Sequence, residues 1–228
     1  LLSEDPRTRL SCMARTGAPA APRWNIEVLY LPPVWVEKHA GELGKSEVMG
    51  TGEHDWALVR IVSTRDGSPL APMPALPFDT REVAAAQGDQ ALVAGYPAEF
   101  VGVATAQLNL YPVTSVVTLG APLTFASVTV DVLSLGGSIA AQGGSSGGAV
   151  VNAWGRLVGL ITTTTEGKTT GERDLHAITL NYIDRDSAGL TGMGLAQFLA
   201  GDLATRQANF NTEIAPDLIR QLLTAQRR

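Results

Sequence analysis

The amino-acid sequence predicts an all-β protein, a sandwich or barrel of short strands, with helices only near its C-terminal end. The 228 residues include 24 Gly and 13 Pro, only 17% are charged, and Val and Thr are frequent. This composition favours strands over helices. Short apolar runs also recur with turn residues between them, which is typical of such folds. Beyond residue 192 the apolar residues instead follow a helical repeat.

Two apolar runs predict strands in the first third of the chain. Residues 25–31 alternate between apolar and polar side chains and are followed by two prolines, which end a strand. Residues 56–62 are a stronger strand candidate. We expect residues 34–53 to form a loop with a short second element. The proline-bearing stretch 63–78 is expected on the surface, as a linker between two halves.

The second half of the chain is denser in strand signals. The candidates are residues 90–96, 101–117 (one or two strands broken near Pro112), 127–135, 157–163 and 175–183. In the third of these runs Val128, Val130 and Val132 alternate with other residues, which predicts one buried face. No repeat of fixed period accompanies these strands.

The end of the chain predicts two helices, at residues 193–203 and 216–226, with Pro216 in a first-turn position. The apolar residues expected on one face of the second helix are Ile214, Leu218, Ile219, Leu222 and Leu223. We expect this face to pack on the β-structure. A partner-binding helix is the alternative.

Charge and cysteine content exclude several classes of partner. The net charge is −5, and no Lys/Arg cluster occurs before Arg227 and Arg228, which argues against a nucleic-acid partner. The single cysteine, Cys12, excludes an internal disulfide, and no Cys/His spacing suits a metal, so no cofactor is predicted. No apolar run reaches membrane-spanning length. The chain begins at Leu1 without a signal-peptide pattern and is expected to be a fragment or a processed product.

Residues 143–151, GGSSGGAVV, carry the strongest chemical signal. Glycine lets the backbone take positive φ and lets other groups approach it closely. A serine in such a turn can face a substrate while backbone N–H groups point at one spot. That is the geometry of a serine nucleophile with an oxyanion hole. The alternative is a flexible Gly/Ser linker.

The surroundings of this stretch resemble the chymotrypsin-like (trypsin-fold) serine proteases. Residues 144–148 fit G-x-S-G-G and lead into an apolar run, a turn, and a second run containing L-V-G-L-I. Residues 52–61, GEHDWALVRI, look like the family's aspartate segment, and V-A-G-Y-P at 93–97 adds support. The resemblance covers roughly residues 24–183, and it is strongest at 52–61 and 143–183.

The resemblance implies a double Greek-key β-barrel whose first barrel is incomplete. Residues 1–78 would be the remainder of that barrel and the linker, 79–185 the second barrel, and 186–228 a C-terminal helical segment. It also implies a bacterial-type serine endopeptidase acting on peptides or proteins in a secreted or cell-envelope setting. It indicates nothing about oligomeric state.

The resemblance also assigns roles to individual residues. Ser146 would be the nucleophile and Asp55 the buried acid, with the backbone N–H groups of Gly144 and Ser146 as oxyanion donors. Asp55 could instead cap a turn before a strand. Substrate-binding residues would be Thr162, Thr163 and Thr164, beside an added peptide strand, and His176, on the pocket wall with Thr163. Ala140 and Ala141 fall at the pocket floor, so a basic substrate side chain would find no acid there. Ser145 replaces the aspartate of animal digestive members.

The general base is missing from the recognisable motifs. The chain has three histidines, and nothing in residues 1–54 matches the family's T-A-x-H-C segment. His54 adjoins Asp55 and should leave the backbone on the opposite face. His39 has the right order but no matching surroundings, and we expect it in a solvated loop. Residues 1–6 resemble the segment that comes after A-H-C in secreted bacterial relatives. We therefore expect the catalytic histidine upstream of Leu1, and this chain alone to be nearly inactive.

Three other interpretations of the sequence compete with this one. A protease-fold binding module that has lost its base remains open. The nucleophile elbow of α/β-hydrolases needs a helix directly after the serine, whereas Ser146 is followed by a strand and a turn. In that interpretation the downstream His176 would also lack an orienting acid, because Asp174 is only two residues away. A structural or adhesion domain would explain the strands but not residues 143–148.

Overall fold

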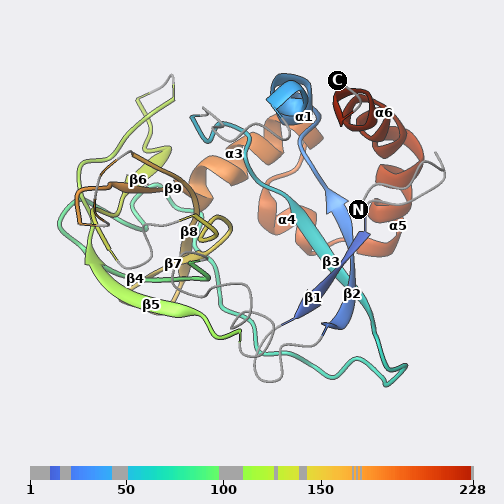
Figure 1. Ribbon diagram of the computed structural model, residues 1–228, viewed down its shortest axis with the longest axis horizontal. Helices are drawn as coiled ribbons and strands as arrows, with labels where there is room; N and C mark the ends of the chain where they lie inside the picture. The colour runs from blue at the N-terminus through green and yellow to red at the C-terminus, as the bar shows by residue number, and fades with distance from the viewer. Residues whose placement is uncertain are drawn as a thin grey trace.

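The computed structural model describes residues 11–15, 22–42, 51–97, 110–125, 128–138, 143–165, 167, 169 and 171–226. Its strands form two antiparallel sheets, and helices cover the first of them (Figure 1). The predicted class, a β-structure followed by C-terminal helices, is confirmed. None of the helices in the described ranges is both long and apolar enough to cross a bilayer.

The first sheet has three strands in the order β1-β2-β3, and it is the part of a first barrel that the described residues contain. Its strands are β1 Ser11–Arg15, β2 Pro22–Tyr30 and β3 Leu58–Thr64. The second sheet has six strands in the order β5-β4-β7-β8-β9-β6 and curls around its own core. Its strands are β4 Gln90–Gly95, β5 Val113–Thr118, β6 Val132–Ser134, β7 Ala149–Asn152, β8 Leu157–Thr164 and β9 Leu175–Thr179.

Helix α1, Pro33–His39, and a 3₁₀ turn, Ala40–Glu42, occupy part of the stretch expected to be a loop. Pro33 fixes φ in the first turn, where its missing N–H costs nothing. Val36 is completely buried, so core packing completes a helix that is too short to be stable alone. A short element was expected within this stretch, and the structure shows that it is helical.

Helix α3, Leu180–Thr191, replaces the second half of the strand expected at 175–183. The hydroxyl of Thr179 accepts the N–H of Tyr182 at 2.9 Å and caps the helix. A threonine cap ends β9 within a continuous apolar run, which periodicity alone does not reveal. The predicted burial of Val128 was also wrong, because its side chain is fully exposed and β6 begins only at Val132. Residues 101–109 and 127, parts of the strands predicted at 101–117 and 127–135, lie outside the described residues.

The helix expected at 193–203 is shorter in the structure, where it is α4, Leu195–Leu199. A further helix that was not predicted, α5, Leu203–Asn209, begins because Asp202 caps it by accepting the N–H groups of Ala204 and Thr205. A π-helical turn, Phe210–Ile214, leads into α6, Ala215–Gln226, which confirms the last predicted helix. The predicted apolar face of α6 packs into the core.

Two hydrophobic cores hold the elements together. The first lies between the three-stranded sheet and the helices, where Tyr30 stacks on Trp56 with ring centroids 5.6 Å apart and also contacts Phe198 and Phe210. Burial there raises the pKa of Tyr30 to about 12. The second core fills the six-stranded sheet around Val93, Val150 and Ile161. Helix α3 contacts β8 and β9, so it joins the two regions (Figure 1).

Candidate active site

The glycine-rich segment forms a built turn before β7, not a linker. Gly144 and Gly147 have φ of 94° and 81°, which favours glycine at both positions. The Gly147 N–H donates to Ile161 O at 2.8 Å and the Gly148 N–H to Ser145 O at 2.9 Å, so the turn is tied to β8 and to itself. A β-carbon at Gly148 would lie 2.5 Å from a β4 carbonyl oxygen.

The two serines of the turn face opposite ways. Ser145 is 1% exposed, and a β-carbon at Gly95 of β4 would lie 3.3 Å from its Cβ. Ser146 is exposed, and its hydroxyl donates to Thr162 O at 3.1 Å. Of the two, Ser146 is therefore the one that presents its hydroxyl to an incoming molecule.

Two backbone donors on this turn have no acceptor among the described residues. Within the described ranges, neither the Gly144 N–H nor the Ser146 N–H donates to another residue. Backbone N–H groups left unpaired beside an exposed hydroxyl are suited to stabilising a developing oxyanion.

Asp55 sits in a tight turn just before β3. Its N–H donates to Gly52 O at 3.2 Å, and the Trp56 N–H donates to His54 O at 2.9 Å. Gly52 has φ of 84°, and a β-carbon there would lie 3.1 Å from Thr162 Oγ1. The turn thus presses against β8, the strand that accepts the Ser146 hydroxyl bond.

Burial raises the pKa of the Asp55 carboxyl, and the nearby His39 opposes the rise. No described residue donates a hydrogen bond to this half-buried carboxylate. An ionised carboxylate without donors is costly in such a place, which is the physical reason for the raised pKa.

Asp55 and Ser146 line one pocket of about 490 Å³. The other lining residues are Leu31, Trp35, Trp56, Ala57, Gly147, Leu160, Ile161 and Thr162. Thr162 Oγ1 is buried there without a hydrogen-bond partner in the described chain. The two residues predicted from separate motifs are therefore brought together, around a largely apolar space that can admit a further side chain or a small molecule.

His39 is the last residue of α1, so the expectation of a solvated loop was wrong for this residue. Its side chain is half-buried, with Nδ1 3.0 Å from Glu42 Oε2 and the ring centroid 5.3 Å from that of Trp35. Its charge reaches Asp55, but no hydrogen bond among the described residues joins His39 to Asp55 or to Ser146.

His54 points away from the pocket, toward α3. Its Nδ1 lies 2.8 Å from Asp186 Oδ1, while the indole N–H of Trp56 donates to Asp186 Oδ2 at 2.7 Å. Sequence reasoning missed Asp186 because it lies just after a run interpreted as a strand, at the start of the helical segment. No local signal could have paired it with residues 130 positions earlier.

His176 lies on β9, opposite Ser134 of β6. Its Nε2 is 3.1 Å from Asp174 Oδ2, and Asp174 also accepts the Ser134 hydroxyl and the Gly136 N–H. The expectation that Asp174 could not orient His176 was wrong, because residues i and i+2 of an extended chain share a face. The conclusion against the nucleophile elbow holds, since strand β7 follows Ser146.

The remaining predicted substrate residues lie on β8. Thr162 and Thr163 are half-buried and Thr164 is exposed, near a shift in the β8–β9 register between Ile161 and Thr164. Ala140 and Ala141 lie outside the described residues. A peptide-binding role for these threonines stays a prediction.

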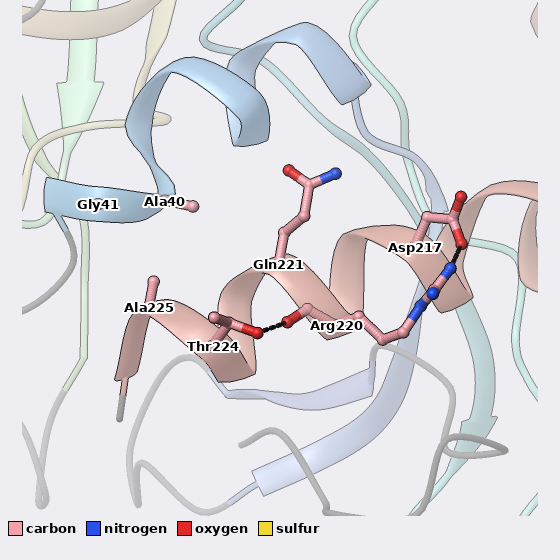
Figure 2. A pocket seen from close by; sticks show the side chains of 7 residues that line it. All are labelled: Ala40, Gly41, Asp217, Arg220, Gln221, Thr224 and Ala225. Atoms are coloured by element: carbon pink, nitrogen blue, oxygen red, sulfur yellow. Dashed lines mark hydrogen bonds and ion pairs between the residues drawn. The ribbon is translucent and has the colours of Figure 1, made fainter. Parts of the chain in front are cut away.

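A second hollow, of about 580 Å³, lies between the end of α1 and helix α6 and contains none of the predicted residues. Figure 2 shows Gln221 reaching toward the α1 side, while Arg220 pairs with Asp217 along the helix. Both charged side chains are largely exposed. The described residues that line this hollow include none of the serine, acid and base groups proposed for bond cleavage.

Comparison with known families gives one match. Residues 25–160 match the model of the trypsin-like peptidase domain, which is more than half of the chain. A comparison with curated protein sequences gave no match.

Similar solved structures are distant. An inactive mutant form of Rv3671c from M. tuberculosis H37Rv is 16% identical over 59% of this chain and 60% of that one, with a TM-score of 0.39. The MamO protease domain from Magnetospirillum magneticum is 19% identical over 77% and 74%, with a TM-score of 0.40. The HtrA-type protease AlgW with a tripeptide is 20% identical over 60% and 48%, with a TM-score of 0.37. The chain thus spans less than two thirds of the first and third of these structures.

Proposed function

Because the chain belongs to the trypsin-like peptidase family, and so to the hydrolases of peptide bonds, we propose that it is a serine endopeptidase that works through an acyl-enzyme. The observation that carries the proposal is the shared pocket, which is lined by both Ser146, with its exposed hydroxyl, and Asp55. A nucleophile and an orienting acid from distant parts of the chain meet there.

In the proposed reaction Ser146 Oγ attacks the carbonyl carbon of the substrate and gives its proton to a general base. The oxygen of the tetrahedral intermediate accepts hydrogen bonds from the Gly144 and Ser146 N–H groups. Losing one such donor costs about 2.7–4 kcal/mol of barrier. The intermediate then expels the amine, which takes the proton from the base. Water, activated by the same base, hydrolyses the acyl ester and frees Ser146.

The proposed base is a histidine from sequence preceding Leu1 that enters the pocket beside Asp55. Two facts support this. Each histidine of the chain is already placed against another carboxylate, that of Glu42, Asp186 or Asp174. The Asp55 carboxylate also lacks a donor among the described residues, and an imidazole N–H in the pocket would supply one and lower its pKa.

Substrates of the proposed enzyme are peptides or proteins bound as an added strand along β8, with Thr162, Thr163 and Thr164 beside the peptide and His176 on the pocket wall. β8 lies between β7 and β9, but its described backbone bonding on the β7 side ends at Ile161, so an added strand would lie beside residues 162–164. A secreted or cell-envelope setting and a bacterial origin belong to the same proposal.

A protease-fold binding module without activity is the second candidate. The observation that favours it is the Ser146 hydroxyl bond to Thr162 O, which turns the serine proton toward a carbonyl instead of a base. In this alternative the pocket would bind a peptide or side chain without cleaving it.

A fluorophosphonate probe, which reacts with activated serines, separates the two candidates. We expect the chain to be labelled slowly at Ser146, and faster when imidazole is added to replace the base, with no labelling of Ser146→Ala. Asp55→Asn should lose most of the imidazole effect. The full-length protein should be labelled without imidazole and should carry a histidine within a few residues before Leu1. Absence of labelling in the full-length protein would favour the binding module.

A further inference from the structure

The backbone next to Asp55 is strained. His54 has φ of 60°, and it is the one non-glycine residue in the described ranges with positive φ. Histidine tolerates this left-handed region better than most residues, but the conformation still has to be held by its surroundings.

Three hydrogen bonds from helix α3 hold this segment in place. Tyr182 Oη accepts the backbone N–H of His54 at 3.0 Å. Asp186 uses both carboxylate oxygens, one 2.8 Å from His54 Nδ1 and the other 2.7 Å from Trp56 Nε1. Tyr182 and Asp186 are four residues apart, so they share one face of the helix.

Both anchors are well placed to be rigid. The Asp186 side chain is only 9% exposed and Tyr182 is buried, so water competes weakly for these bonds. The groups that face His54 from other elements are Glu53, with Oε1 3.7 Å from His54 Nε2, and Lys38, which pairs with Glu53 at 3.1 Å.

We propose that Asp186 and Tyr182 are positioning residues that fix Asp55 by clamping its two neighbours, His54 and Trp56, from behind the pocket. The inference rests on the proposed function, because the position of Asp55 matters for the reaction only if Asp55 is the catalytic acid. Neither Asp186 nor Tyr182 lines the pocket that contains Ser146. The clamp would affect the reaction through the place of the Asp55 carboxylate and of Trp56, which lines the same pocket.

Two substitutions of one residue test the clamp. His54→Ala removes the bond to Asp186 and leaves a residue ill suited to positive φ. His54→Asn keeps an N–H donor and tolerates that φ. We expect His54→Ala to slow imidazole-assisted labelling of Ser146 by about tenfold or more, because misplacement by about 1 Å can cost on the order of a hundredfold. His54→Asn should stay within about threefold of the unaltered chain, because its donor is retained.

Asp186→Asn should act like His54→Ala, because an amide keeps one acceptor and turns a donor toward the second N–H group. Asp184→Ala is the matched control. Asp184 is a carboxylate on the same helix, but it accepts the backbone N–H of Leu195 at 2.7 Å instead of bonding His54 or Trp56. This control should lower the melting temperature but leave the labelling rate unchanged.

The outcomes separate the clamp from the proposed function. If His54→Ala and Asp186→Asn label as fast as Asp184→Ala, the clamp is wrong although the enzyme stands. If the unaltered chain is not labelled with or without imidazole, the proposed enzyme fails, and the clamp is then tested by carboxyl ¹³C NMR titration of Asp55. A pKa of Asp55 that differs between His54→Ala and His54→Asn, both neutral at this position, supports the clamp. Equal values overturn it.

Discussion

Alanine substitutions at three glycines of the turn that carries Ser146 should have sharply different effects on stability. At Gly143 a β-carbon would meet nothing within 4 Å, and φ is not positive. At Gly147 the space is also open, but φ is 81°. At Gly148 the β-carbon would lie 2.5 Å from the Ala94 carbonyl oxygen and 2.8 Å from the Ser145 carbonyl oxygen. Alanine should therefore be tolerated at Gly143, should strain the backbone at Gly147, and should collide with neighbouring atoms at Gly148.

The expected losses of unfolding free energy follow from these environments. Gly143→Ala should stay within about 0.5 kcal/mol of the unaltered chain, as for a surface change. Gly147→Ala should cost about 1–2 kcal/mol for the left-handed conformation. Gly148→Ala should cost about 3 kcal/mol or more, since the colliding atoms belong to the backbone and cannot rotate away.

Urea unfolding followed by tryptophan fluorescence measures these differences. Labelling of Ser146 in the same variants shows whether the turn keeps its shape, and we expect only Gly143→Ala to retain the rate of the unaltered chain. Equal losses at Gly143 and Gly148 would refute the reasoning, because they would show that the turn is not packed between β4 and β8 as described.

Three further predictions concern stability. Burial raises the pKa of Asp55, so the folded protein holds this proton more tightly than the unfolded chain, and stability is lost as pH rises through the raised pKa. Asp55→Asn should therefore be more stable than the unaltered chain at pH 7 and equally stable near pH 3, measured by thermal unfolding. Bonds from Arg81 hold the pKa of Asp79 at about 2, so Asp79→Asn should be less stable at pH 7, by about 1 kcal/mol given the exposure of Arg81, and the gap should close as pH falls from about 4 toward 2. Thr179→Ala, which removes the α3 cap, should cost about 1 kcal/mol in urea unfolding, whereas Thr179→Ser should be nearly neutral.

Most of the strands, and the two residues that share the pocket, could be predicted from the sequence because their signals are local, whereas β1 was not predicted. Alternation marks β2 and β4, and the D-W-A-L and G-S-S-G-G motifs mark Asp55 and Ser146 within a few residues each. The structure brings those two residues to one pocket. Their catalytic roles remain predictions.

The features that sequence reasoning missed depend on long-range contacts. Leu180 and Ile183 continue the apolar run of β9, and only the Thr179 cap and tertiary packing turn that run into a helix. Asp186 pairs with His54 across 132 positions, a contact that no spacing rule describes. A short element was expected near α1, but its helical form was not predicted because it depends on burial of Val36.

The C-terminal helices are an integral part of the first core. Three strands make a sheet too small to bury its own apolar face, and α3 to α6 cover that face with side chains such as Phe198 and Leu218 (Figure 1). The same α3 that closes this core carries Asp186, which bonds the residues on both sides of Asp55. Packing of the first sheet and placement of the proposed catalytic acid therefore depend on one helix, so changes that loosen α3 should affect stability and the pocket together.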